Sequence, residues 1–393
     1  MRRLLILVSS LVMVDTMLFA ALTPMLPRFA SELGLSKTGA GSLVAAYAAG
    51  ALLAGLPAGR AAVRFGPRRA ILVGLTMMGL ASLGFALADS YGTLLAARIF
   101  QGAGSAFTWA GSFAWLLHTA GDSRGELIGK AMGAAVFGAL LGPVVGAAAD
   151  LAGREVIFSA LAVLALALAI ATLRLEPPPD MAPSRTTLAG ALRHPRMGAG
   201  LAILMIASLL FGVLSVLAPL RLAADGWGAV EIGAMWLVSA AIEAWESPIV
   251  GRLSDRLGPL TPIRYALLAS LVVSLALAGD PAAAIYAPLV VVAGAAFGAL
   301  FTPSFALISE GAERSGLPQG IAFGLMNGAW ALGAMVGPAA AGAIATATGD
   351  PVPFLLAACV CVAALGAIRS ATGARVASSP GTPAATPTER RAS

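Results

Sequence analysis

Two charged side chains, Asp15 and Arg98, lie inside long apolar segments of this sequence, where a charge is costly. If the segment 4–27 is a helix rising about 1.5 Å per residue, Asp15 lies roughly 17 Å from either end of it. A carboxylate at that depth in a membrane costs at least about 2.5–3.5 kcal/mol unless it faces a cavity, pairs with a cation or takes up a proton. Asp15 is therefore predicted to be a proton acceptor or a counter-charge for a cationic ligand. The alternative is a carboxylate that only ties two helices together.

Arg98 lies in the sequence ARIFQGAGSAF, roughly 9 Å inside the end of its apolar segment, with Gln101 one turn further on. The guanidinium fork can pair with a carboxylate or hold water. A side chain that only reaches back to the membrane surface is the alternative. We expect Arg98 to act on Asp15 or on a water near it.

Other polar and aromatic side chains of the apolar segments are weaker candidates. Glu243 and Glu246 lie one turn apart on one helix face. We expect Glu243 to be either a second protonation site or a structural residue, and Glu246 to pair with an arginine at the membrane surface. Trp109, Asn327 and Trp330 are candidates for lining a central cavity, although a hydrogen bond between helices would explain Asn327 equally well.

The composition places most of the chain in a membrane. Hydrophobic residues make up 59% and charged residues 11% of the 393 residues, whereas a soluble domain has about 25% charged residues. Each of twelve apolar segments is near or above the ~20 residues that cross a bilayer as a helix. We therefore expect an all-α integral membrane protein with twelve transmembrane helices, at about residues 4–27, 40–60, 70–89, 92–117, 126–150, 155–175, 198–222, 230–251, 261–279, 282–308, 318–346 and 350–369.

The sequence contains two copies of one unit. GRAAVRFGPRR, from Gly59, recurs as GRLSDRLGP from Gly251, and GALLGPVVGA, from Gly138, recurs as GAMVGPAAAG from Gly333. The first segment resembles a signal peptide, but the second copy needs a counterpart for it, so we expect it to be retained. The predicted organisation is a six-helix bundle at 1–175, a cytoplasmic linker at 176–197, a second six-helix bundle at 198–369 and a disordered cytoplasmic tail at 370–393.

Glycines recur every four residues in both copies of the GALLGPVVGA sequence, with a proline beside them. Small residues let helix backbones approach closely, and proline bends a helix or lets it flex. We expect a helix-packing face made of Gly138, Gly142, Pro143, Gly146, Gly333, Gly337 and Pro338.

The basic residues follow a membrane topology and form no patch for nucleic acid. If both termini are cytoplasmic, most arginines and lysines fall in cytoplasmic loops and ends, while Arg28, Lys37, Arg154 and Arg221 fall on the other side. This is the positive-inside pattern. This placement leaves no basic arm for a nucleic-acid partner. Alanine and glycine are abundant and arginine far exceeds lysine, as in GC-rich bacteria, so we expect a multi-pass protein of a bacterial inner membrane, in contact with lipid.

The sequence lacks the short motifs of catalysis and cofactor binding. It has no GxxxxGK phosphate loop, no HExxH and no paired-cysteine metal motif, and it has two cysteines and two histidines. We therefore expect no enzyme activity, no nucleotide, no metal and no other cofactor, and a chain that functions as a monomer. Energy for any transport would come from an ion gradient or from the gradient of the substrate.

Three motifs resemble those of the major facilitator superfamily, specifically its twelve-helix drug/proton antiporter branch. GRAAVRFGPRR and GRLSDRLGP are similar to the family's loop signature. RIFQGAGSA is similar to its helix 4 signature, and GALLGPVVGA to its helix 5 signature. In that family the aspartate of the loop motif latches the cytoplasmic gate, but Val63 stands at its position here and Pro67 replaces a basic residue, so we expect Asp255 to carry more of the latch. The resemblance implies a gating role for Gly59, Arg60, Gly66, Arg68, Arg69, Gly251, Asp255, Arg256 and Gly258.

The residues and the resemblance together predict a secondary transporter that works by alternating access. Two bundles would rock about a midplane cavity, exchanging protons for a small amphipathic or cationic compound, as in drug efflux by an antiporter. The resemblance implies that an acid at the position of Asp15 serves transport. The alternatives are a facilitator or proton symporter for a sugar, amino acid or other metabolite, and a membrane sensor without flux. Sparse polar residues speak against sugars, which need several fixed polar partners.

Overall fold

The computed structural model describes residues 2–119, 124–176, 194–317 and 319–377, and these residues are almost entirely helical. Proline, glycine and short polar turns separate long apolar runs, so each run forms one helix and ends where the turn begins. The helices are α1 Arg2–Ala20, α2 Leu22–Glu32, α3 Lys37–Arg64, α4 Pro67–Leu87, α5 Tyr91–Thr119, α6 Arg124–Ala152, α7 Arg154–Leu173, α9 Pro195–Ala224, α10 Ala229–Leu257, α11 Leu260–Ala278, α12 Ala283–Gly298, α13 Phe301–Ser315, α14 Gln319–Thr348 and α15 Pro351–Ala377.

Ten stretches of the described chain are long and apolar enough to cross a membrane. Helices α5 and α10, each of 29 residues, are long enough to span but are not among these ten. Both helices contain polar residues inside the apolar stretch, Arg98 and Gln101 in α5 and Glu243 and Glu246 in α10. The predicted all-α membrane fold is confirmed.

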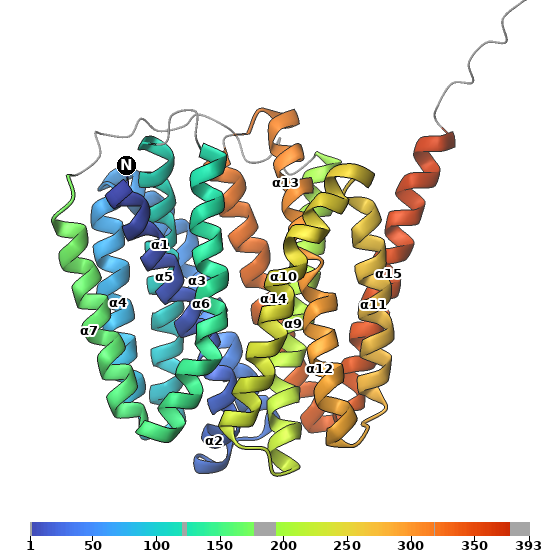
Figure 1. Cartoon of the computed structure of the whole chain (residues 1–393), viewed down its shortest axis with the longest axis horizontal. Coiled ribbons are helices and arrows are strands. Elements are labelled where there is room, and N and C mark those ends of the chain that lie inside the picture. The colour runs from blue at the N-terminus through green and yellow to red at the C-terminus, as the bar shows by residue number, and fades with distance from the viewer. Residues whose placement is uncertain (1, 120–123, 177–193, 318, 378–393) are drawn as a thin grey trace, which may run out of the picture.

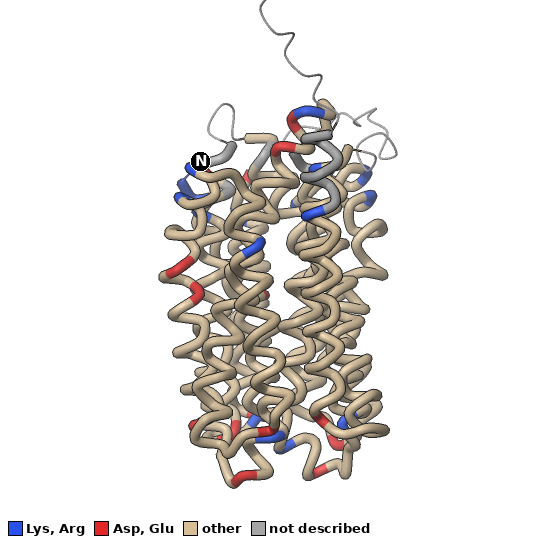
Figure 2. The backbone as a smooth tube through the Cα atoms, turned by 90° about the vertical axis from the view of Figure 1, so that its right-hand side faces the viewer, with Lys and Arg blue, Asp and Glu red and all other residues tan. Residues whose placement is uncertain are grey.

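The helices form two bundles side by side, α1 to α7 and α9 to α15 (Figure 1). Helix α1 begins, and α15 ends, on the same side of the molecule, which we call the terminal side; the opposite side is called the far side. Charged residues gather on these two sides, while the middle of the bundles is nearly free of them, and Lys and Arg dominate the terminal side (Figure 2). This distribution fits a molecule whose middle lies in hydrocarbon.

Two of the predicted transmembrane segments are broken. Helices α1 and α2 meet at Ala21, and α12 and α13 are separated by the two-residue turn 299–300, so the predicted continuous helices 4–27 and 282–308 are wrong in this respect. Pro24 and Pro303 follow the two breaks within one turn. Because proline has no N–H, it cannot donate to the carbonyl four residues earlier, and the helix is interrupted there.

The borders of the linker and the tail differ from the prediction. Helix α9 begins at Pro195, so residues 195–197 are helical, and residues 177–193 of the predicted linker lie outside the described residues. Helix α15 continues to Ala377, beyond residue 370, where we expected the tail to begin. Three of the residues 370–377 are alanine, which favours helix. The remainder of the tail, 378–393, is outside the described residues.

The packing glycines lie where helices of one bundle touch. A Cβ added at Gly138 of α6 would overlap the Met13 carbonyl of α1, and Gly142 and Gly146 face the same broken segment. On α14, Gly333 and Gly337 face carbonyls of α9, and Pro143 and Pro338 lie inside their helices beside these glycines. Backbones this close leave no room for a side chain.

The two bundles meet tightly on the far side. Lys37 of α3 forms an ion pair with Asp350, which follows α14. The backbone N–H and the hydroxyl of Thr38 lie 3.0 and 2.9 Å from the hydroxyl of Thr346. Gly41 lies directly against the α14 backbone, where a Cβ would overlap a carbonyl. The far side is therefore closed in this structure.

Candidate functional site

Asp15 is buried in the N-terminal bundle, with 2% of its surface exposed. The Tyr47 hydroxyl donates to Oδ1 at 2.9 Å and to Oδ2 at 3.0 Å. Oδ2 also accepts from the Ser105 hydroxyl at 2.9 Å and from Nε1 of Trp109 at 2.6 Å. Since a carboxylate oxygen has two lone pairs and Oδ1 shares a single donor, Oδ1 retains the capacity to take a proton or contact a cation.

Close packing of α3 on α5 fixes these donors. A Cβ at Gly102 would overlap the Tyr47 carbonyl, and one at Gly50 would overlap the Ile99 carbonyl, so glycine is needed for the two helices to approach. Ser105 and Trp109 lie one turn apart on α5 and face the same direction. Tyr47 on one helix and two donors on the other therefore converge on one carboxylate of α1.

Arg98 is also buried, with 1% of its surface exposed, and it is held by neutral groups. Its Nη1 donates to Oε1 of Gln101 at 2.8 Å and to the Leu18 carbonyl at 3.4 Å, and its Nη2 donates to the Phe19 carbonyl at 3.3 Å. These carbonyls belong to the last turn of α1, where unpaired carbonyls give a helix a partial negative charge. Within the described residues Arg98 forms no ion pair with Asp15, so the broken helix supplies its counter-charge.

Tyr47 connects Arg98 with Asp15. The Arg98 guanidinium carbon lies 5.1 Å from the centre of the Tyr47 ring, while the hydroxyl of the same ring bonds to Asp15. The guanidinium also lies 5.8 Å from the Phe19 ring and 6.0 Å from the Phe85 ring. Such cation–π contacts stabilise a buried guanidinium. The two charges predicted to interact therefore share one tyrosine.

The C-terminal bundle reaches this site through Trp330 of α14. The Trp330 ring lies 5.3 Å from Phe19 and 6.5 Å from Tyr47, edge-on to both, and Phe19 lies 4.9 Å from Tyr47. Trp109, one turn from Ser105, stacks on Phe113, and Phe113 stacks on Phe323 of α14. Aromatic rings from both bundles therefore surround the buried carboxylate.

The other predicted polar candidates lie apart from Asp15. Glu243 of α10 packs on α12, where a Cβ at Gly298 would lie 2.6 Å from its Cγ. Asn327 is exposed. One oxygen of Glu246 is buried without a hydrogen-bond partner among the described residues, so the surface ion pair that we expected for it is not formed there.

The repeated loop motif forms the turns between α3 and α4 and between α10 and α11. Gly66 and Gly258 have φ angles of 87° and 77°, which side chains rarely adopt, so the motif needs glycine there. Asp255 is exposed and forms no ion pair with a described residue, so its role as a latch stays a prediction. Of the remaining motif residues, Gly59 and Arg60 lie near the end of α3, and Gly251 and Arg256 near the end of α10. Arg68 and Arg69 lie in the first turn of α4, and the guanidinium of Arg68 donates to the Leu173 carbonyl.

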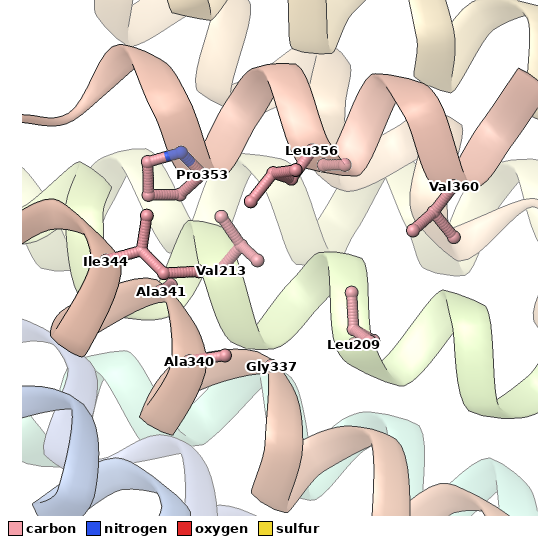
Figure 3. Close-up of a pocket in the computed structure, with 10 residues that line it drawn as sticks. Leu209, Val213, Gly337, Ala340, Ala341, Ile344, Pro353, Leu356 and Val360 are labelled. Atoms are coloured by element: carbon pink, nitrogen blue, oxygen red, sulfur yellow. The ribbon is translucent and has the colours of Figure 1, made fainter. Parts of the chain in front are cut away.

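A separate cavity of about 140 Å³ lies between α9, α14 and α15 (Figure 3). Its lining side chains are apolar, among them Leu209, Ile344 and Leu356. It offers nothing that could bind a proton or a charged group, so it is not the site formed around Asp15.

Five of the residues around Asp15 were not identified from the sequence as part of a site: Tyr47, Ser105, Phe19, Phe113 and Phe323. Each is an ordinary residue in an apolar helix, and only the packing of α1, α3, α5 and α14 brings them to Asp15. A tyrosine within an alanine-rich transmembrane segment is the signal that could have identified Tyr47, because its hydroxyl needs a partner there.

A membrane fold of two helical bundles, with a carboxylate and an arginine buried in one of them, is the arrangement of a membrane transporter. The family model of the Major Facilitator Superfamily matches residues 8–323, and the chain therefore belongs to this superfamily of secondary transporters. Two solved structures are similar to it, both with a TM-score of 0.74. One is a nucleoside transporter, NupG, at 15% identity, covering 93% of this chain and 99% of the other. The other is a D-xylose-proton symporter at 16% identity, covering 93% and 96%.

A curated relative is also similar over part of its length. The "Probable vesicular acetylcholine transporter-B" of Danio rerio is 30% identical over 177 residues, which are 42% of this chain and 36% of that protein. The match thus spans little more than a third of the relative. The solved structures, at their low identity, show the fold alone.

Proposed function

We propose that this protein is a proton-coupled antiporter that exports small cationic or amphipathic compounds, including drugs, across a bacterial inner membrane. The observation that carries the proposal is the Asp15 site. In this buried carboxylate Oδ2 accepts from three neutral donors, whereas Oδ1 shares a single donor with it. Such a group can hold a proton or face a cation, but the proton removes the charge that attracts the cation.

The geometry gives each neighbour of Asp15 a role. The donors Tyr47, Ser105 and Trp109 stabilise the ionised carboxylate after its proton has left. A cationic substrate then pairs with Oδ1, and the aromatic rings of Phe19 and Trp330 beside Tyr47 favour an organic cation. A proton that binds Oδ1 cancels the attraction and releases the substrate, so the two ligands exchange.

The proteins similar to this chain are named for one organic cation and for two uncharged metabolites. The partial relative is named for acetylcholine, which is a quaternary ammonium cation. The structural neighbours are named for a nucleoside and for D-xylose with a proton, so a facilitator or symporter for a metabolite is the second candidate. The buried polar side chains around Asp15 are few, which favours an organic cation over a polyol.

The charged residues on the two sides of the molecule support an orientation of the protein in the membrane. Lys and Arg dominate the terminal side (Figure 2), and positive residues favour the cytoplasmic face. We therefore place both termini in the cytoplasm, with the closed far side facing outward. In this orientation the structure is closed to the outside.

The test is proton flux in liposomes that contain the purified protein and a pH-sensitive dye. A panel of cationic, neutral and anionic amphiphiles is added in turn, and Asp15→Asn is compared with Asp89→Asn, an exposed carboxylate at the far side. We expect cation-driven proton flux in the wild type and in Asp89→Asn, and none in Asp15→Asn at equal expression.

The other outcomes decide between the alternatives. Full flux in Asp15→Asn would move the coupling elsewhere, with Glu243→Gln as the next variant. Substrate movement without proton flux would identify a facilitator. Binding without movement of any compound would identify a sensor.

A further inference from the structure

A row of three stacked rings connects Asp15 to the opposite bundle. Trp109, whose Nε1 donates to Asp15 at 2.6 Å, lies 5.4 Å from Phe113 with an interplanar angle of 24°. Phe113 lies 5.1 Å from Phe323 at 17°. Phe323 belongs to α14, so the row begins at the buried carboxylate and ends in the other half of the molecule.

The row lies between Asp15 and the terminal side. Helix α5 runs toward that side, so Phe113 is one turn closer to it than Trp109. Helix α14 begins there, and Phe323 is in its second turn. Trp330, two turns further along α14, packs on the opposite flank of the site. Helix α14 therefore touches the N-terminal bundle near Asp15 through Phe323 and Trp330, in addition to its contact with α3 on the far side.

The contact at Phe323 is much smaller than the contact on the far side. There, an ion pair, the Thr38–Thr346 hydrogen bonds and direct backbone packing join the bundles. At Phe113 and Phe323 two apolar rings meet by stacking. Rings exclude water and ions while they are stacked, and their separation breaks no hydrogen bond.

We propose that Phe113 and Phe323 are the gate that closes the Asp15 site toward the terminal side, and that Trp109 is a positioning residue that links the gate to the carboxylate. The proposal rests on the Asp15 site of the proposed function. When Phe323 leaves, Phe113 loses one of its two stacking partners, and the packing that aims the N–H of Trp109 at Oδ2 is loosened. This bond is the shortest to Asp15, so opening the gate changes the preference of the carboxylate for a proton.

The first test measures access to the site without measuring transport. Ser105→Cys places a thiol beside Asp15, in a protein in which Cys359 and Cys361 are replaced by serine. A membrane-impermeant thiosulfonate is added from the terminal side. We expect labelling to be about two- to tenfold faster with Phe323→Ala, the range that corresponds to the loss of one ring pair. Phe323→Tyr, which keeps a ring, should label like the parent.

Phe305→Ala is the matched control, because Phe305 lies in α13 of the same bundle and packs on Phe301 outside the row. If the thiol is labelled at the same rate in Phe323→Ala and in Phe305→Ala, the proposed gate is refuted. Labelling is independent of proton coupling, so the gate can hold even if Asp15→Asn shows that protons are coupled elsewhere.

The second test addresses Trp109. Trp109→Phe keeps a ring for stacking but removes the N–H. We expect Trp109→Phe and Phe323→Ala to move the pH at which exchange is half-maximal in the same direction, while Phe323→Tyr leaves it in place. A shift in Trp109→Phe without one in Phe323→Ala would refute the link between the gate and the carboxylate.

Discussion

Removal of one hydroxyl group, by Tyr47→Phe, should change the pH dependence of exchange. The Tyr47 hydroxyl is the donor that reaches both oxygens of Asp15, at 2.9 and 3.0 Å. The ring itself, with its contacts to Arg98 and Phe19, is retained in the variant. The substitution therefore removes a hydrogen bond to a charged group and little else.

The size of the effect follows from that bond. A hydrogen bond to a charged group contributes about 1.5–3 kcal/mol, and one pH unit corresponds to about 1.36 kcal/mol. The ionised carboxylate loses this stabilisation, so more alkaline conditions are needed to remove its proton. We expect the pH of half-maximal exchange to rise by about one to two units. Ser105 and Trp109 still donate to Oδ2, which favours the lower end of this range.

The assay is substrate-driven proton flux in liposomes between about pH 5 and 9. Tyr91→Phe is the control, because the Tyr91 hydroxyl lies 2.5 Å from that of Ser42, near the far side, and is not part of the site. Tyr91→Phe should follow the wild-type profile. If the profiles of Tyr47→Phe and Tyr91→Phe coincide, the hydroxyl does not stabilise the ionised Asp15, and the reasoning fails.

Three further results are expected. Gly142→Leu should lower the yield of folded protein in gel filtration, since overpacking costs about 1–3 kcal/mol. Gly133→Leu, in open space on the same helix, should not lower it, and equal yields of the two variants would contradict the packing described for Gly142. Asp255→Asn should impair transport at a normal amount of protein in the membrane, and unchanged transport would exclude the latch. Asp350→Asn removes a partly exposed ion pair with Lys37 that contributes about 1 kcal/mol or less. The rate at which the Ser105→Cys thiol is labelled from the far side should therefore rise modestly. An unchanged rate would show that the ion pair does not hold that side closed.

The fold could be predicted from the sequence because its signals are local. Apolar segments of spanning length and a loop sequence repeated from Gly59 and Gly251 indicate two six-helix halves without knowledge of any contact. The depth of Asp15 also follows from counting along one helix. The breaks after Ala20 and Gly298 had a local signal too, in Pro24 and Pro303, but hydropathy averages across them.

The site could be predicted only in part because its partners come from different helices. Asp15 and Arg98 attract notice as charges in hydrocarbon, yet the sequence does not show that both contact Tyr47. The approach of α3 to α5 decides this, through glycines that fit against backbone carbonyls. Glu243, like Asp15, is a carboxylate within an apolar segment, but it packs on α12. Tertiary packing sets the rotation of each helix, and the sequence does not show it.

The counter-charge of Arg98 is backbone, and this determines the electrical character of the exchange. The carbonyls at the end of α1 cannot take up a proton at physiological pH, and a guanidinium stays charged there, so these contacts of Arg98 do not change with pH. Under the proposed exchange, Asp15 and not Arg98 gains and loses the coupled proton. A monovalent cation leaving for one entering proton moves no net charge, so a pH gradient would drive transport and the membrane voltage would do no work on it.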